Sequence, residues 1–154
     1  MLETIHAHTE PLLSDVRILF REYADSLGFH LCFQDFEQEL AELPGRYSPP
    51  SGAILIARWD SKIAGCVAMK KLWDEICEMK RFYVRPDFRG RGIGQTLSMA
   101  IIDEARRAGY RSMRLDTVPS MQSAIKIYEA LGFRDTEKYV FNPVPGVRYL
   151  ELVL

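Results

Sequence analysis

The stretch VRPDFRGRGIGQT, from Val84 to Thr96, separates a segment with the pattern of a strand from one with the pattern of a helix. Glycine has no Cβ, so the glycines of its GRGIG run allow the backbone to approach a ligand closely. A helix that begins in this loop leaves its first amides unpaired, and these amides and the helix dipole favour a pyrophosphate. The stretch therefore predicts a phosphate-binding loop, to which Arg89 and Arg91 add positive charge.

Other phosphate-binding loops do not fit this stretch. A dinucleotide-binding fingerprint would need glycine or alanine at Gln95, and a Walker loop would need Gly-Lys followed by Ser or Thr. The alternative without a ligand is a glycine-rich turn that merely starts a helix.

The flanking pattern predicts alternating strands and helices. Residues 76–84 read as a strand that stops before Pro86, and residues 93–105 read as an amphipathic helix that Gly109 ends. The remaining expected elements are helices at 11–27, 34–41 and 121–131, and strands at 53–59, 62–72, 111–118, 133–141 and 147–153. This order predicts a mixed sheet with helices on both faces and a right-handed parallel crossover from 76 to 118.

Composition limits the function classes. The 154 residues fit one domain, 47% of them are hydrophobic, and 20 basic residues balance 21 acidic ones. The formal charge of -1 argues against nucleic acid or an anionic membrane as a partner. Cys32, Cys66 and Cys77 form no CxxC pair, so we expect neither disulfides nor a metal site. Without a signal sequence or a spanning apolar stretch, the chain reads as cytoplasmic.

The glycine-containing loop resembles the Q/R-x-x-G-x-G/A signature of the GNAT superfamily of N-acetyltransferases, with Arg89, Gly92 and Gly94 in the defining places. The elements between residues 53 and 134 follow in the same order as that superfamily's core. The resemblance implies an α/β (α+β) fold with a mostly antiparallel sheet of about seven strands. It also implies a splay between the fourth and fifth strands, about four helices over both faces, and a single domain over residues 1–154.

Acetyl-coenzyme A is the co-substrate that the resemblance implies. Its pyrophosphate would lie on the amides of residues 90–95, and its pantetheine arm would pair with residues 82–84 like an added strand. The cofactor-binding residues expected are Phe82, Tyr83, Val84, Arg89, Gly90, Arg91, Gly92, Ile93, Gly94 and Gln95. One departure is Met121, where many relatives have an asparagine, and Ser120 or Ser123 would have to supply a polar contact instead.

The resemblance also implies direct attack of an amine on the thioester. Tyr128, in IYEALGF, matches the tyrosine that protonates the leaving thiolate, although its helical spacing suits a core residue equally well. Glu78 is the expected base, acting through water, and strict alternation would put it on the same strand face as Phe82 unless a bulge intervenes. The alternative for Glu78 is an ion pair with Lys80 or Arg81.

The acceptor is expected to be a small amine or an amino acid, with a protein or peptide amine as the second choice. Candidate wall residues are Arg21, Tyr23, Phe33, Arg46 and Tyr47, although arginines in such places are usually solvated. A non-catalytic acyl-CoA sensor is a third reading, but it has no need of Glu78 and Tyr128. Homodimers are common in the superfamily, and the sequence predicts no interface.

Overall fold

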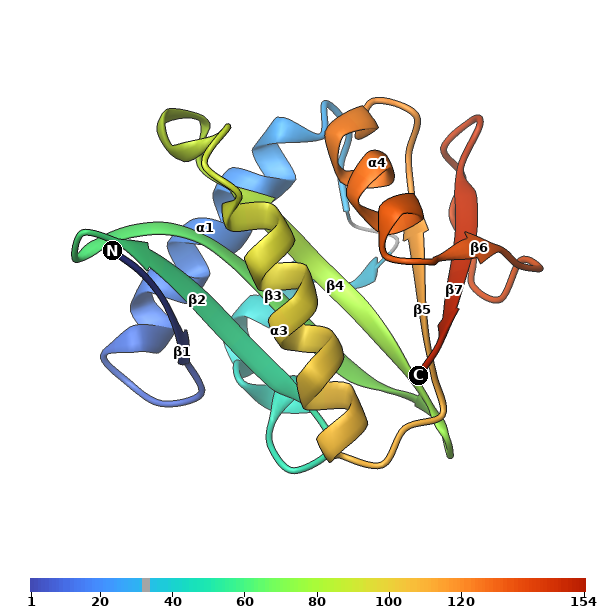
Figure 1. Ribbon diagram of the computed structural model, residues 1–154, viewed down its shortest axis with the longest axis horizontal. Helices are drawn as coiled ribbons and strands as arrows, with labels where there is room; N and C mark the ends of the chain where they lie inside the picture. Colours follow the sequence, from blue (N-terminus) through green and yellow to red (C-terminus); the bar gives the residue numbers. More distant parts are fainter. Residues whose placement is uncertain (32–33) are drawn as a thin grey trace.

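The computed structural model describes residues 1–31 and 34–154, and its centre is a mixed sheet (Figure 1). Within the described residues the strand order is β1-β2-β3-β4-β5-β7-β6. The strands are β1 (Leu2–His6), β2 (Ala53–Trp59), β3 (Lys62–Trp73), β4 (Ile76–Val84), β5 (Ser112–Thr117), β6 (Arg134–Asp135) and β7 (Arg148–Val153). Among these described strands only β4 and β5 pair in parallel, and their connection carries a helix, as a parallel crossover requires.

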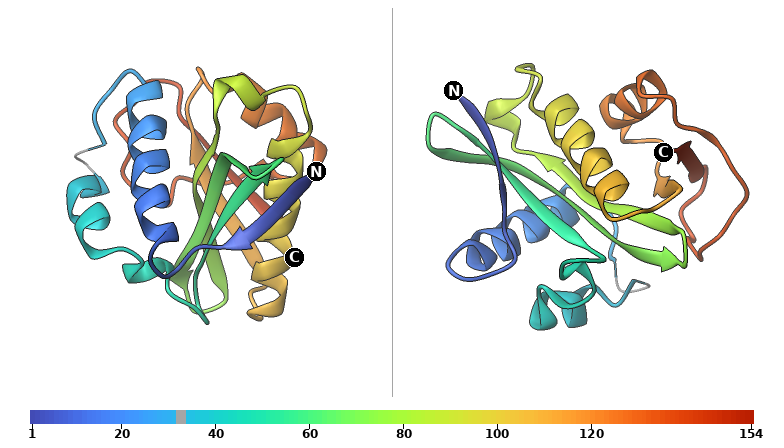
Figure 2. Two further views of the ribbon diagram at one scale, coloured as in Figure 1. Left: turned by 90° about the vertical axis from the view of Figure 1, so that its left-hand side faces the viewer. Right: turned by 60° about the horizontal axis from the view of Figure 1, so that its bottom comes forward.

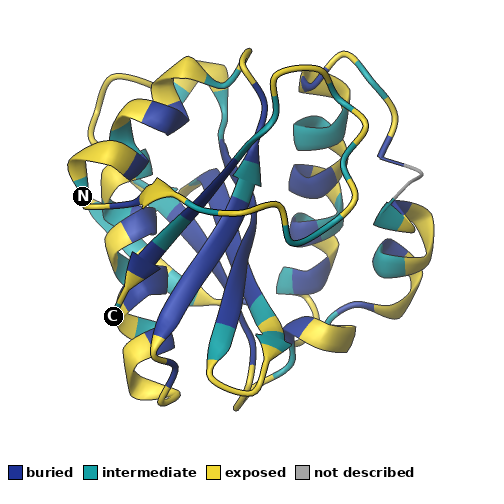
Figure 3. Cartoon of the chain, turned by 90° about the vertical axis from the view of Figure 1, so that its right-hand side faces the viewer, coloured by how far each residue is buried: buried dark blue, intermediate teal, exposed yellow. Residues whose placement is uncertain are grey.

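Helices cover both faces of the sheet (Figure 2). They are α1 (Leu12–Ser26), α2 (Phe36–Glu42), α3 (Ile93–Arg107) and α4 (Gln122–Ala130) among the described residues. Helices α3 and α4 lie on one face, and α1 and α2 lie on the other (Figures 1 and 2). Each face has its own hydrophobic core, and the buried residues follow the sheet and the inner helix surfaces (Figure 3). The predicted fold class is therefore confirmed.

Strands β4 and β5 separate after three residue pairs. The last pair is Glu78 with Arg114, and beyond it β5 continues to pair only with β7. Figure 1 shows the two strands close at one end and apart at the other. Because each strand keeps its outer neighbour, the gap leaves free backbone groups on the inner edges. This is the expected splay between the fourth and fifth strands.

A β-bulge at Arg81 interrupts the alternation of β4. Cys66 faces Tyr83 while Ala68 faces Lys80, so β4 holds one residue more than β3, and Arg81 has a φ of 60°. As a consequence Phe82 joins the core beneath α3, whereas Glu78 lies on the other face, away from Met79. Strict alternation would have put Glu78 and Phe82 together, and the bulge is the reason that it does not hold.

The sequence pattern failed for two strands, one predicted too long and one not predicted at all. The expected strand at 133–141 is wrong for most of its length, because only Arg134–Asp135 pairs with β7. One more bond, from the Thr136 amide to the Tyr149 carbonyl, follows before the chain leaves the sheet, and Tyr139 then turns toward Glu78. Strand β1 was not expected. None of the described helices is both long enough and apolar enough to cross a membrane.

Candidate functional site

A groove of about 380 Å³ lies between the glycine-containing loop and the start of α4. We call it the glycine-loop groove. Every expected cofactor-binding residue except Arg91 lines it. Its walls are Ser26, Phe82, Tyr83, Val84, Phe88, Arg89, Gly90, Gly92, Ile93, Gly94, Gln95, Ser120, Met121, Gln122, Ser123, Ala124 and Ile127.

The start of α3 gives this groove an anion-binding end. Gly92 precedes the helix with a φ of 76°, a left-handed conformation that glycine adopts without strain. The first helical bond runs from the Thr96 amide to the Gly92 carbonyl at 3.1 Å, so the amides of residues 93–95 have no acceptor within the helix. Gly94 is also packed closely, because a Cβ there would lie 3.0 Å from the Phe82 ring. These amides suit a phosphate group.

The two arginines of the loop lie differently. Arg89 lines the groove, and its Nε donates to the Val84 carbonyl at 3.0 Å. Arg91 lies outside the groove lining, with its guanidinium carbon 5.2 Å from the Trp59 ring centroid and 5.7 Å from that of Phe88. Arg91 therefore packs on aromatic side chains beside the groove.

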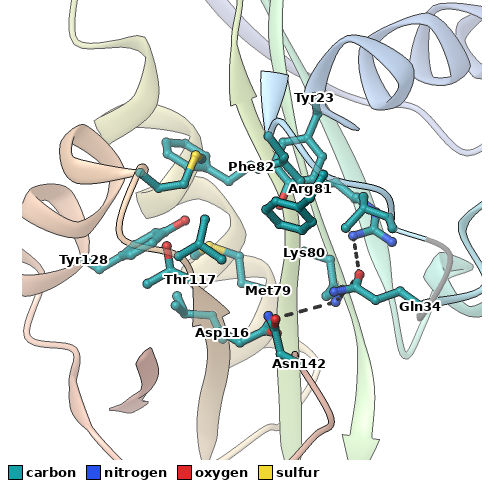
Figure 4. Close-up of a pocket in the computed structure, with 16 residues that line it drawn as sticks. Tyr23, Gln34, Met79, Lys80, Arg81, Phe82, Asp116, Thr117, Tyr128 and Asn142 are labelled. Carbon is teal, nitrogen blue, oxygen red and sulfur yellow. Dashed lines mark hydrogen bonds and ion pairs between the residues drawn. The ribbon is translucent and has the colours of Figure 1, made fainter. Parts of the chain in front are cut away.

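A second, smaller cavity of about 40 Å³ occupies the gap between β4 and β5 (Figure 4). We call it the strand cavity. Phe82 and Met121 line both the strand cavity and the glycine-loop groove, so the two spaces meet at these side chains. The other lining residues are Tyr23, Leu27, Phe29, Leu31, Gln34, Met79, Lys80, Arg81, Leu115, Asp116, Thr117, Val118, Tyr128 and Asn142.

Tyr128 lines the strand cavity from α4. Its ring centroid lies 5.8 Å from that of Phe82 and 5.6 Å from that of Phe133. The hydroxyl is directed into the cavity near Thr117 (Figure 4). Burial, with smaller contributions from Tyr23 and Asp116, raises the pKa of Tyr128 above its usual value of 10.0. The phenol is therefore protonated at neutral pH and available as a proton donor.

A buried polar network forms the opposite wall of the strand cavity. Lys80 Nζ donates to Gln34 Oε1 at 3.0 Å and lies 4.0 Å from Asp116 Oδ1. Asn142 Nδ2 donates to Asp116 Oδ2 at 2.9 Å. Arg81 donates to both carboxylate oxygens of Glu39, at 2.9 and 3.0 Å, and also to Gln34 Oε1 at 2.8 Å. The strand cavity is thus lined by charged groups from both splayed strands, Lys80 and Arg81 from β4 and Asp116 from β5.

Glu78 does not line the strand cavity. It is buried, its Oε2 accepts a hydrogen bond from the Tyr139 hydroxyl at 2.7 Å, and its Oε1 lies 3.9 Å from Lys70 Nζ. Burial, followed by repulsion from Lys80, lowers the pKa of Lys70 to about 8. The Glu78 carboxylate is therefore held near the point where β4 and β5 part, and does not touch the open space beside Tyr128.

The predicted acceptor-wall residues are not gathered in one place. Tyr23 lines the strand cavity and packs edge to face on Tyr83, with a centroid distance of 6.5 Å. Arg21 instead forms two hydrogen bonds with Glu37 on the surface, at 3.0 and 3.2 Å. Arg46 donates to the Lys71 carbonyl at 3.3 Å.

Of the last two predicted wall residues, one lies away from the strand cavity and the other falls outside the described residues. Tyr47 is buried and donates to Glu39 at 2.9 Å. Phe33 lies outside the described residues.

Sequence reasoning did not single out Lys80, Asp116, Gln34 and Asn142 as site residues. Asp116 carried a usable signal, since it is a lone acid near the end of the strand MRLDTV. In the sequence, Lys80 stands out only as an ion-pair partner for Glu78. Nothing local distinguishes Asn142, because it reaches the site from the loop that replaced most of an expected strand.

The described thiols are poor nucleophiles. Cys66 and Cys77 are both free and buried. Burial raises the pKa of both thiols, to about 12 for Cys77, so almost none of either is ionised at neutral pH. Cys32 lies outside the described residues. Over the described ranges, no three His, Cys, Asp or Glu side chains converge as metal ligands would.

Comparison with known proteins identifies relatives of this chain. The acetyltransferase (GNAT) family model matches residues 14–133. An uncharacterised N-acetyltransferase of Schizosaccharomyces pombe is 42% identical over 142 residues, which are 91% of this chain and 87% of that protein. The N-acetylaspartate synthetase of Danio rerio is 32% identical over 114 residues, covering 71% of this chain and 39% of that enzyme.

Solved structures share the fold as well. A GNAT family acetyltransferase of Elizabethkingia anophelis, with acetyl-CoA bound, superposes with a TM-score of 0.68 at 23% identity. The superposition covers 99% of this chain and 98% of that one.

Proposed function

The chain belongs to the acetyltransferase (GNAT) family, and from that premise we propose that it transfers the acetyl group of acetyl-coenzyme A directly to the primary amine of a small molecule or amino acid. The observation that carries this proposal is the meeting of two spaces beside one phenol. A groove that ends in free helix amides meets a small polar cavity at Phe82 and Met121, and Tyr128 lines that cavity.

The glycine-loop groove supports acetyl-CoA as the donor. Its free amides at residues 93–95 match a pyrophosphate, and the unpaired inner edge of β4 offers backbone groups to an extended pantetheine arm. Ser120 and Ser123 line the groove beside Met121, where they are placed to supply polar contacts. The Elizabethkingia anophelis relative carries acetyl-CoA in its structure, which agrees with this assignment.

We propose Tyr128 as the general acid. The reaction turns an ammonium and a thioester into an amide and a thiol, and one proton is released overall. After the ammonium loses a proton, the amine nitrogen attacks the thioester carbon and the carbon–sulfur bond breaks. The departing thiolate takes the Tyr128 proton, and the phenolate is reprotonated by the proton that the attacking nitrogen gives up.

We propose Glu78 as the base that accepts the first proton through water. A direct transfer does not suit the geometry, because the Glu78 carboxylate is hydrogen-bonded to Tyr139 and does not line the strand cavity. A relay from the cavity to the point where β4 and β5 separate is therefore part of this proposal.

The size of the strand cavity favours a small acceptor. A volume of about 40 Å³ admits the reacting end of a molecule or roughly three waters, since one water needs about 10–15 Å³ on this measure. The name of the Danio rerio relative also refers to an amino-acid product. A peptide amine is the second candidate, because a groove that contains Arg21 adjoins the cavity at Phe29 and Leu31. A non-catalytic acyl-CoA sensor would not need Tyr128 at the junction.

We also propose that residues 1–154 act as one domain in the cytoplasm. The sheet links the two ends of the chain, and the free thiols of Cys66 and Cys77 suit a reducing compartment.

The test is to incubate the purified chain with acetyl-CoA and pooled amines, amino acids and peptides. Free thiol is then measured with a colorimetric thiol reagent, and acetylated products are measured by mass spectrometry. We expect thiol release matched by an acetylated small amine or amino acid. Binding of acetyl-CoA without turnover of any acceptor would favour the sensor, and absence of binding would exclude the donor assignment.

A further inference from the structure

We propose that the strand cavity recognises the head group of a free α-amino acid, with Asp116 binding its ammonium and Lys80 binding its carboxylate. This inference rests on the proposed acetyl transfer and narrows the acceptor to amines that carry a carboxylate on the neighbouring carbon.

The Lys80–Asp116 pair is placed where the sheet opens. Lys80 lies two residues beyond Glu78 on β4, and Asp116 lies two residues beyond Arg114 on β5. The two side chains therefore face each other immediately after the last paired residues of the splay. Their exposed fractions are only 8% and 6%.

The pair is also incompletely closed. The nitrogen–oxygen distance of 4.0 Å between Lys80 and Asp116 is too long for a hydrogen bond. The neighbouring Arg81–Glu39 pair has two hydrogen bonds at 2.9 and 3.0 Å. Buried charges are normally both paired and hydrogen-bonded, because an unsatisfied charge is costly away from water. A ligand that forms hydrogen bonds with both Lys80 and Asp116 would therefore gain a large electrostatic contribution to its binding free energy.

Both charged groups have unused hydrogen-bonding capacity. The Lys80 ammonium has three donors and gives one to Gln34, while Asp116 accepts a hydrogen bond from Asn142 on Oδ2. A zwitterion supplies an acceptor for Lys80 and a donor for Asp116, and it leaves the net charge of the cavity unchanged. A simple amine satisfies Asp116 alone.

The other charged lining residue is already committed. Arg81 donates to Glu39 and Gln34. Because Gln34 Oε1 accepts from both Lys80 and Arg81, it fixes the Lys80 ammonium, and its own NH₂ group is a second donor for a carboxylate. Within the described lining of the strand cavity, Lys80 is thus the cation that has no hydrogen-bonded carboxylate partner.

The order of the residues orients the acceptor. In Figure 4, Asp116 lies between Tyr128 on one side and Lys80 with Gln34 on the other. An ammonium on Asp116 therefore lies toward Tyr128 and the junction with the glycine-loop groove, and a carboxylate on Lys80 lies away from it. This orientation turns the amine toward the acetyl donor.

The first experiment uses the unaltered protein. For each of several amino acids, kcat/KM is compared among the free acid, its amide and the amine that lacks the carboxylate. We expect the free acid to be preferred by about tenfold or more, the effect of one charge-assisted hydrogen bond. The amino group of the amide is less basic than that of the free acid, so a larger fraction of it is neutral and able to attack at neutral pH. A preference for the free acid therefore cannot come from the intrinsic reactivity of the amine. Equal values for the three forms would overturn the inference.

Two variants then separate the roles. Lys80→Met is expected to lower kcat/KM about 10- to 100-fold for free amino acids and to change it clearly less for the amines without a carboxylate. Asp116→Asn is expected to lower kcat/KM for every acceptor. Lys71→Met and Asp74→Asn are matched controls, because they break a Lys–Asp pair in which both side chains are exposed.

Acetyl-CoA affinity and the unfolding temperature are measured for all four variants. Equal losses for acids and amines in Lys80→Met would show a merely structural role and overturn the inference. If a buried variant does not fold, the comparison on the unaltered protein decides. If the protein acetylates amines but shows no preference for those with a carboxylate, only this inference is overturned. If it acetylates no acceptor, the proposed function is overturned together with this inference.

Discussion

Glu78 and Arg114 are the last residues of β4 and β5 to face each other, and the two strands part directly beyond them. The pair divides two environments on the same face of the sheet. On the paired side, Glu78 accepts a hydrogen bond from Tyr139, and the Arg114 guanidinium carbon lies 5.6 Å from the same tyrosine ring centroid. On the open side lie Lys80, Asp116 and the strand cavity.

Replacing Tyr128 with phenylalanine tests the proton donor. The variant keeps the ring that packs between Phe82 and Phe133 and loses only the hydroxyl. We expect kcat to fall about 100-fold or more, the usual contribution of a general acid, and the dissociation constant of acetyl-CoA to stay the same. Steady-state kinetics and calorimetric titration measure the two quantities.

Tyr110→Phe is the matched control for that experiment. Tyr110 is also a nearly buried tyrosine, but its hydroxyl donates to the Ser51 carbonyl away from both the groove and the strand cavity. It should leave kcat unchanged. Comparable losses in turnover and in cofactor affinity for Tyr128→Phe would contradict a role as acid.

Replacing Glu78 with glutamine tests the base. Without the carboxylate the acceptor must lose its proton to bulk water, and the neutral fraction of an alkyl amine of pKa about 10 grows with pH. We therefore expect kcat/KM to fall at neutral pH and the loss to shrink as the pH rises. The measurement is the ratio of the two kcat/KM values between pH 6.5 and 9.5.

Tyr139→Phe supplies the comparison for this pH profile. It removes the hydrogen bond to Glu78 Oε2 but keeps the carboxylate. A smaller loss than that of Glu78→Gln fits a base, whereas a ratio for Glu78→Gln that stays constant with pH would leave the residue a structural role only.

Local pattern predicted the elements around the glycine-containing loop closely. Strands β2 and β4 have the expected bounds, and α3 begins at the expected Ile93, directly after Gly92. These segments combine regular periodicity with unambiguous stops. The failure at 133–141 has a long-range cause, because Tyr139 is drawn to Glu78, 61 residues away in the sequence.

The site was less accessible to prediction than the fold. Ten of the 17 residues that line the glycine-loop groove lie between Phe82 and Gln95, so a motif of three positions in that stretch sufficed to place most of the lining. The strand cavity is built from parts of two strands, two helices and three connecting loops. Its Lys80–Asp116 pair depends on the bulge and the splay. Neither feature leaves a recognisable spacing of charged residues in the sequence.

Replacing Gly92 with alanine tests the anion-binding end of the groove. A Cβ at a φ of 76° costs about 1–2 kcal/mol in the left-handed conformation, so the loop is expected to shift. We expect acetyl-CoA to bind several-fold more weakly. Gly109→Ala introduces similar strain at a φ of 89° beyond the other end of α3, with nothing within 4 Å of the new Cβ.

Titration of acetyl-CoA into both glycine variants makes the comparison. Both should unfold at a lower temperature than the parent chain, but only Gly92→Ala should lose affinity. If Gly109→Ala weakens binding to the same extent, the effect comes from helix stability and the loop has no special part in holding the cofactor.

Two Arg–Glu pairs whose glutamates lie on α2 provide a test of what burial contributes to stability. Arg81 bonds Glu39 through two hydrogen bonds and its side chain is 1% exposed, whereas Arg21 bonds Glu37 through two hydrogen bonds on the surface. Glu39→Gln leaves the Arg81 charge buried without a compensating carboxylate. We expect a loss of about 3 kcal/mol in the free energy of unfolding, or roughly 6–12 °C in Tm.

Glu37→Gln removes the same chemical group from the exposed pair. Because water solvates both charges there, we expect almost no change in Tm. Thermal unfolding followed by circular dichroism compares the two variants under one condition. Similar shifts for both would mean that the Arg81–Glu39 bonds add nothing beyond a surface pair. In that case the bulge at Arg81, and with it the position of Lys80, must be held by packing on Tyr23 and Phe36.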